Sequence, residues 1–166
     1  MKITSFYFAY CLTLLGFSVF AEPIQLRCHM DSCSWANIQT INKLEHGKDG
    51  GELNEITYFY GSSFHKDDLT YPDSYSDKFY IDWDKDIAKI MVYCSNKRPA
   101  VFGKNALIQT FEFPLVYGFE MSALDIYMHT CHDTKYLGNN EIFTDLGYVK
   151  IQRKQFNSVQ ELLNEF

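Results

Sequence analysis

The stretch LNEITYFYG, residues 53–61, decides the fold class of this chain. It is rich in β-branched and aromatic side chains, which favour extended strands. The cluster GKDGG at 47–51 comes shortly before it, and the stretch SWANIQTINKL at 34–44 precedes that cluster. Because glycine clusters mark turns between strands, we expect 34–44 and 53–61 to pair as an antiparallel hairpin.

Later segments carry the same strand signals. We expect a strand at 78–84, a charged turn at 84–86 and a second strand, IAKIMVY, at 87–93. The segment 122–130 fits both a helix and a strand, and we favour a strand there so that Cys131 can reach another cysteine. Further strands are expected at three places: 100–102, 106–113 and within 147–152.

The C-terminal end changes to helical spacing. Ser158 and Glu161 match a capping box. The apolar residues of the helix that follows fall on one side of it: Val159, Leu162, Leu163 and Phe166. The prediction is therefore an α+β fold, a mostly antiparallel β-sheet with a short C-terminal helix.

The N-terminal end has the layout of an export signal. Met1-Lys2 precedes an uncharged, largely apolar run at 6–21 that ends in Val19-Phe20-Ala21. We predict a signal peptide at 1–21 and a single β-rich domain at 22–166, in the periplasm or secreted. The 16-residue run is shorter than the roughly 20 residues that span a bilayer, so we expect no membrane insertion of the mature chain.

The charge of the chain restricts the kinds of ligand that it can bind. It has 15 Lys+Arg against 21 Asp+Glu, which argues against nucleic acid as a ligand.

Four cysteines follow the predicted signal peptide. In an exported chain they predict two disulfides, which can be connected in three alternative ways. Spacing favours Cys28–Cys33 and Cys94–Cys131. A zinc site is the alternative, but C-x4-C is not a usual zinc spacing.

No motif of known chemistry is complete. The stretch DWDKD at 82–86 resembles the start of a calcium loop, but Ile87 and Tyr93 stand where that loop needs Gly and Glu. His129 and His132 could together bind a metal, but we interpret them as ordinary structural or surface histidines. We therefore predict no catalytic residue, no metal and no cofactor, and keep a wall hydrolase with an unrecognised acid pair as an alternative.

A long polar loop is predicted at 62–77, and the candidate binding residues lie in it. Tyrosines in loops offer a large contact area, and neighbouring acids steer a basic partner. Alternatively, the tyrosines fold back on the sheet or stack on sugars. The predicted binding residues are Asp67, Asp68, Tyr71, Asp73 and Tyr75.

Three segments carry a resemblance: SDKFYIDW at 76–83, YCSNKRPAV at 93–101, and Cys28 with CSW at 33–35. They are similar to an uncharacterised family of small exported, disulfide-containing proteins of Gram-negative bacteria. The resemblance covers most of the mature chain and implies a periplasmic location and the same disulfide pairing. It brings no catalytic residues.

Together these features favour a periplasmic protein-binding module, such as an inhibitor or immunity protein against a cell-wall hydrolase or toxin. Its expected partner is a basic exported protein. The alternative is a carbohydrate- or peptidoglycan-binding protein that uses the same tyrosines.

Overall fold

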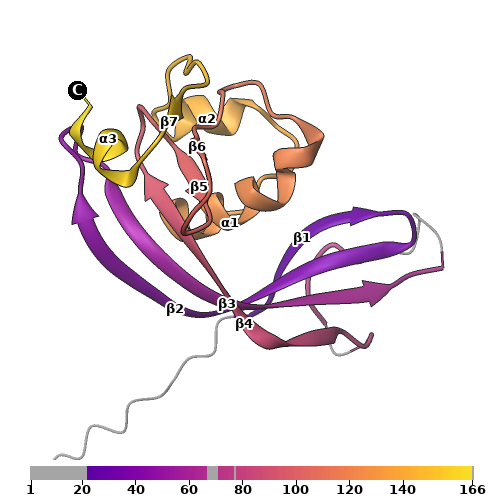
Figure 1. The fold of residues 1–166 in the computed structure, drawn as a ribbon. Helices are drawn as coiled ribbons and strands as arrows, with labels where there is room; N and C mark the ends of the chain where they lie inside the picture. Colours follow the sequence, from indigo (N-terminus) through magenta and orange to yellow (C-terminus); the bar gives the residue numbers. More distant parts are fainter. Residues whose placement is uncertain (1–21, 67–70, 77, 166) are drawn as a thin grey trace, which may run out of the picture.

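The computed structural model describes residues 22–66, 71–76 and 78–165. It confirms the predicted fold class, because an antiparallel sheet of five strands in the order β1-β2-β3-β4-β5 dominates the chain (Figure 1). The strands of this sheet are β1 (Ile24–His29), β2 (Ser32–His46), β3 (Glu52–Phe64), β4 (Asp82–Cys94) and β5 (Ala100–Phe102).

The rest of the chain covers one half of the sheet. It comprises α1 (Met121–His132), α2 (Glu141–Asp145), α3 (Val159–Asn164) and the small sheet of β6 (Ile108–Gln109) and β7 (Gln155–Phe156). The largest core cluster lies between the main sheet and α1, where Ile56 and Val92 pack with Leu124 and Tyr127. None of the helices in the described ranges is both long and apolar enough to cross a membrane.

The predicted hairpin is confirmed. β2 and β3 pair antiparallel from Ser32 opposite Phe64 to His46 opposite Glu52, and the glycine cluster forms the turn. Gly50 has a φ of 84°, which an L side chain rarely adopts. A Cβ on Gly51 would lie 2.7 Å from the Tyr93 ring, so glycine lets the buried Tyr93 pack under the turn.

The other half of the sheet projects as an arm (Figure 1). We define the arm as β1 with the segments of β2, β3 and β4 beside it, residues 32–36, 59–64 and 82–87. It has a small core of its own around Cys33, Trp35 and Ile81, all buried. Three aromatic rings from the chain between β3 and β4 pack on this core: Tyr71, Tyr75 and Phe79.

Both predicted disulfides are confirmed. Cys28 and Cys33 face each other across β1 and β2, with their Cα atoms 4.0 Å apart. Cys94, the last residue of β4, bonds to Cys131 in the last turn of α1. One bond therefore closes the arm hairpin, and the other ties the helix to the sheet.

The strand predicted at 122–130 is wrong, because α1 occupies this segment. Leu124, Tyr127, Met128 and Cys131 follow the spacing i, i+3, i+4, i+7, which places them on one helical face toward the core. Reach to another cysteine did not distinguish the two structures, because the end of a helix delivers Cys131 equally well.

One predicted turn and two further predicted strands also need correction. Residues 84–86 do not form a turn, because the strand β4 runs through them. They form a bulge opposite Tyr60, and β3 pairs with β4 on both sides of this bulge. Of the strand expected at 106–113, only β6 and isolated bridges are present. Of the strand expected within 147–152, only a single bridge between Ile151 and Phe113 is present.

The predicted C-terminal helix is confirmed as α3. Its N-cap residue, Ser158, accepts a hydrogen bond from the Glu161 N–H at 3.1 Å.

Candidate functional site

The described part of the predicted binding loop is fastened at several points. Tyr71 accepts a hydrogen bond on its hydroxyl from the Asp31 N–H at 3.0 Å. The Lys135 ammonium donates to the backbone oxygen of Asp73 at 2.9 Å and to Gln25 Oε1 at 2.7 Å. The Gln25 amide in turn donates to the backbone oxygen of Pro72. β1 and the segment after α1 thus hold residues 71–73 in one conformation.

The tyrosines of this loop also anchor it to the arm core. The Tyr75 ring meets the buried Trp35 edge-on, with centroids 6.4 Å apart, and the Tyr71 ring meets His65 edge-on at 5.9 Å. Trp35 itself donates to Ser63 Oγ at 2.8 Å, and that hydroxyl bonds to His65 Nε2 at 2.8 Å. Both tyrosines are half-buried, whereas Asp73 is exposed between them.

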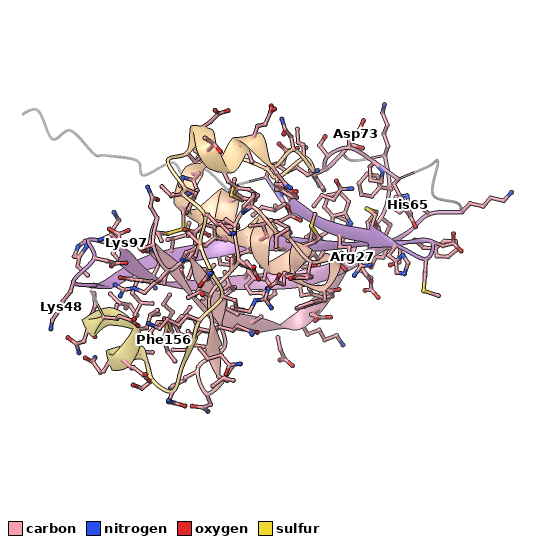
Figure 2. All side chains as sticks on the ribbon, turned by 90° about the horizontal axis from the view of Figure 1, so that it is seen from above. Arg27, Lys48, His65, Asp73, Lys97 and Phe156 are labelled. Carbon is pink, nitrogen blue, oxygen red and sulfur yellow. A yellow bond between two sulfur atoms is a disulfide. The ribbon has the colours of Figure 1, made fainter. Side chains whose placement is uncertain are left out.

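Two adjoining clefts open beside the loop, and Gln25, Asp73 and Lys135 line both. The smaller, about 200 Å³, extends toward Tyr75 and His129. The larger, about 610 Å³, is completed by five more residues: Leu26, Cys28, Tyr71, Pro72 and Leu137. Figure 2 shows Asp73 at the same end of the molecule as His65, far from Lys48 at the hairpin tip.

The fold therefore brings together Tyr71, Asp73 and Tyr75 of the five predicted residues. Asp67 and Asp68 lie outside the described residues, as does the predicted signal peptide. The sequence argument missed Gln25 and Lys135, which are far from the loop in sequence and carry no local motif. Such residues are found only through the three-dimensional fold.

A buried carboxyl group lies within electrostatic reach of this site. Asp125 on α1 is only 3 % exposed, and its Oδ1 has no hydrogen-bond partner among the described residues. Burial raises the pKa of Asp125 to about 7, although the nearby Lys135 charge opposes that shift. His129, one helical turn later, lines the smaller cleft.

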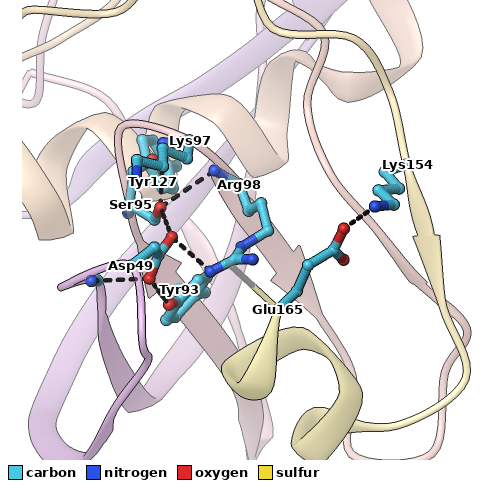
Figure 3. A network of polar contacts seen from close by, with 9 residues as sticks. Asp49, Tyr93, Ser95, Lys97, Arg98, Tyr127, Lys154 and Glu165 are labelled. Carbon is cyan, nitrogen blue, oxygen red and sulfur yellow. Dashed lines mark hydrogen bonds and ion pairs between the residues drawn. The ribbon is translucent and has the colours of Figure 1, made fainter.

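A second polar network joins the hairpin tip to the end of β4 (Figure 3). The Asp49 carboxylate accepts hydrogen bonds from the hydroxyls of Tyr93 and Ser95, the latter at 2.5 Å, and pairs with Arg98 at 2.9 Å. The Asp49 side chain is fully buried. Burial opposes its ionisation, but the Ser95 and Tyr93 hydrogen bonds and the Arg98 charge outweigh this, so the pKa of Asp49 lies below its usual 3.8.

The network continues into α1. The Tyr127 hydroxyl donates to the backbone oxygen of Ser95 at 3.3 Å and shares a 2.6 Å hydrogen bond with Tyr148, which bonds to His132 at 2.5 Å. Ser95 donates its hydroxyl hydrogen bond to the Asp49 carboxylate, and the lowered pKa of this ion-paired group makes it a weak base toward the Ser95 oxygen. The network instead connects the hairpin, β4 and α1.

No group of three or more His, Cys, Asp or Glu side chains with metal-binding geometry occurs within 22–66, 71–76 and 78–165. In comparisons with known proteins, no family model, curated protein or solved structure matches this chain.

Proposed function

We propose that this chain is a periplasmic or secreted protein-binding module that inhibits or neutralises a basic exported protein, such as a cell-wall hydrolase or a toxin. The proposed contact surface is the loop at 71–75 with the two clefts beside it. The observation that carries the proposal is the anchoring of this loop, which holds the exposed Asp73 in a fixed position.

Pre-organisation is what an inhibitor of this kind needs. A loop that is already ordered loses little conformational entropy when it binds, so more of the contact energy appears as affinity. The hydrogen bonds to Tyr71 and to Asp73, together with the nearby Cys28–Cys33 bond, provide that order. The net charge of −6 complements a basic partner and speeds its approach.

The alternative of sugar binding by Tyr71 and Tyr75 has less support. Both rings already make edge-on contacts with rings of the arm core, and both are half-buried. Stacking on a sugar requires an open ring face, whereas contact with a protein surface can use the exposed edge of the loop.

The proposal is tested by inhibition. Oxidised protein, residues 22–166, is added in increasing amounts to a panel of purified cationic wall hydrolases of different bond specificities. The clearing of a cell-wall suspension is then followed by turbidity at low salt. We expect stoichiometric inhibition of at least one hydrolase, and weaker inhibition by Asp73→Ser.

A matched control removes an acid elsewhere. Glu45 is exposed near the hairpin tip, at the opposite end of β2 from the arm, so Glu45→Ser should inhibit as the unmodified chain does. If no hydrolase is slowed at an excess of the protein, or if Glu45→Ser and Asp73→Ser lose inhibition equally, the proposed site is wrong.

A further inference from the structure

The arm has a second face, opposite the binding loop. Successive side chains of a strand alternate between faces. On the loop face lie the Cys28–Cys33 bond and Trp35. The other face therefore carries the side chains that alternate with these: Arg27, His29, Ser32 and Ser34.

These side chains line a pocket of about 180 Å³ together with Ser122 of α1. All five lining residues are polar, and Arg27 and His29 are the exposed ones. The Arg27 guanidinium donates to the backbone oxygen of Gly118 at 3.2 Å, which fixes it at the pocket rim. The pocket thus combines a fixed cation with the hydroxyl groups of Ser32, Ser34 and Ser122, of which the Ser34 hydroxyl already shares a 2.7 Å hydrogen bond with Tyr60.

An exposed aromatic pair adjoins the pocket through Gly118. Tyr117 and Phe119 stack with ring centroids 5.8 Å apart and planes 23° from parallel. Phe119 is 73 % exposed and Tyr117 is 43 % exposed, so neither ring is part of the buried core. The Arg153 guanidinium lies 4.9 Å from the Tyr117 centroid and 5.9 Å from the Phe119 centroid, and it pairs with Glu120 at 2.7 Å, which holds the two rings in place.

We infer that this pocket and the Tyr117–Phe119 pair form a binding site for an acidic saccharide, a sugar that carries a carboxylate or a phosphate. The C–H face of a sugar ring is apolar and electropositive and suits the negative face of an aromatic ring such as Phe119. Its hydroxyls find partners in the serines, and its anionic group pairs with Arg27, whose fork matches both carboxylate and phosphate.

This inference goes beyond the proposed function, because it uses the other face of the arm and no residue of the loop. A chain that binds a hydrolase on one face and an acidic glycan on the other would be held where the hydrolase works. Either activity can fail without the other, since the two sets of residues do not overlap.

The test is titration calorimetry of the oxidised protein with defined probes. Trigalacturonate supplies a carboxylated sugar and glucose 6-phosphate a phosphorylated one. Galactotriose, glucose, acetate and inorganic phosphate supply the neutral sugars and the free anions. We expect one acidic sugar to bind at least about tenfold tighter than its neutral counterpart and than its free anion, as a charged hydrogen bond predicts.

Other outcomes overturn the inference. If neither acidic sugar binds, there is no such site. If a neutral sugar binds as tightly, the anionic group is not recognised, and if phosphate or acetate alone binds as tightly, the pocket holds an adventitious ion only. Each acidic probe is compared with its own neutral sugar and its own free anion, and the larger of the two affinity ratios identifies which anion is preferred.

Two variants and two matched controls locate the site. Arg27→Gln should weaken binding by about tenfold and Phe119→Ala by about threefold to tenfold, since the first removes a charged hydrogen bond and the second a stacking face. Lys85→Gln and Tyr80→Ala remove an exposed cation and an exposed aromatic ring elsewhere, and should change the affinity by less than about twofold. Thermal unfolding verifies that each variant folds, and full affinity in both folded site variants would contradict the assignment.

Discussion

Ser95 donates a hydrogen bond of 2.5 Å to the carboxylate of Asp49, although 46 residues separate them in sequence. Asp49 belongs to the turn between β2 and β3, and Ser95 follows the last residue of β4. The same carboxylate pairs with Arg98, whose side chain is also buried. The buried Asp49 carboxylate therefore helps to hold the hairpin tip against the end of β4.

Replacement of Asp49 by alanine should lower the free energy of unfolding by about 3–5 kcal/mol, because it leaves the Arg98 charge buried without a partner. Urea unfolding followed by circular dichroism measures this change. Lys43→Ala breaks only an exposed ion pair with Glu52 and should cost less than about 1 kcal/mol. Equal effects of the two substitutions would show that the Asp49 network does not stabilise the fold.

Asp125 should make stability fall as the pH rises. Its pKa is raised from 3.8 to about 7 in the folded chain, so between these values the folded protein holds a proton that the unfolded chain releases. The unfolding free energy should therefore decrease from pH 4 to pH 7 and level off above, by an amount of roughly 2–4 kcal/mol.

Asp125→Asn removes this titration without removing the polar side chain. The variant should lack that decrease between pH 4 and pH 7 and should be the more stable protein at pH 8. Urea unfolding at several pH values compares the two proteins. A parallel pH dependence in both would mean that Asp125 ionises normally.

The two disulfides should contribute unequally. In the chain-entropy account, a bond across 37 residues stabilises by about 4 kcal/mol and one across 5 residues by about 2 kcal/mol. Cys94→Ala with Cys131→Ala should therefore cost more than Cys28→Ala with Cys33→Ala, as measured by denaturant unfolding. The reverse order would indicate that the arm, and not the helix attachment, limits stability.

The elements that depend on short stretches of sequence were predicted correctly. The glycines at 47–51 predicted the turn, Ser158 and Glu161 predicted α3, and cysteine spacing predicted both bonds. α1 was missed because apolar residues at 124, 126, 127 and 128 fit both periods. In the folded protein every residue from Leu124 to Met128 is buried, and this tertiary packing favours the helix.

In the candidate site, too, some residues were predictable from the sequence and others were not. Loop composition identified Tyr71, Asp73 and Tyr75, because tyrosines and acids gather there in an otherwise polar segment. Lys135 is 110 residues from Gln25 in sequence, and only the packing of β1 beside α1 brings them together. No pattern in one sequence encodes such a pair.

The central claim is that acids of the loop guide a basic partner, and association kinetics test it most directly. The measurement compares the unmodified chain with the triple variant Asp67→Ser, Asp68→Ser, Asp73→Ser, binding to the hydrolase that it inhibits most strongly. Between about 20 and 200 mM salt, the association rate of the unmodified chain should fall by about tenfold or more. The triple variant should associate more slowly at low salt and with a flatter salt dependence. An unchanged rate and an unchanged salt dependence would contradict the account.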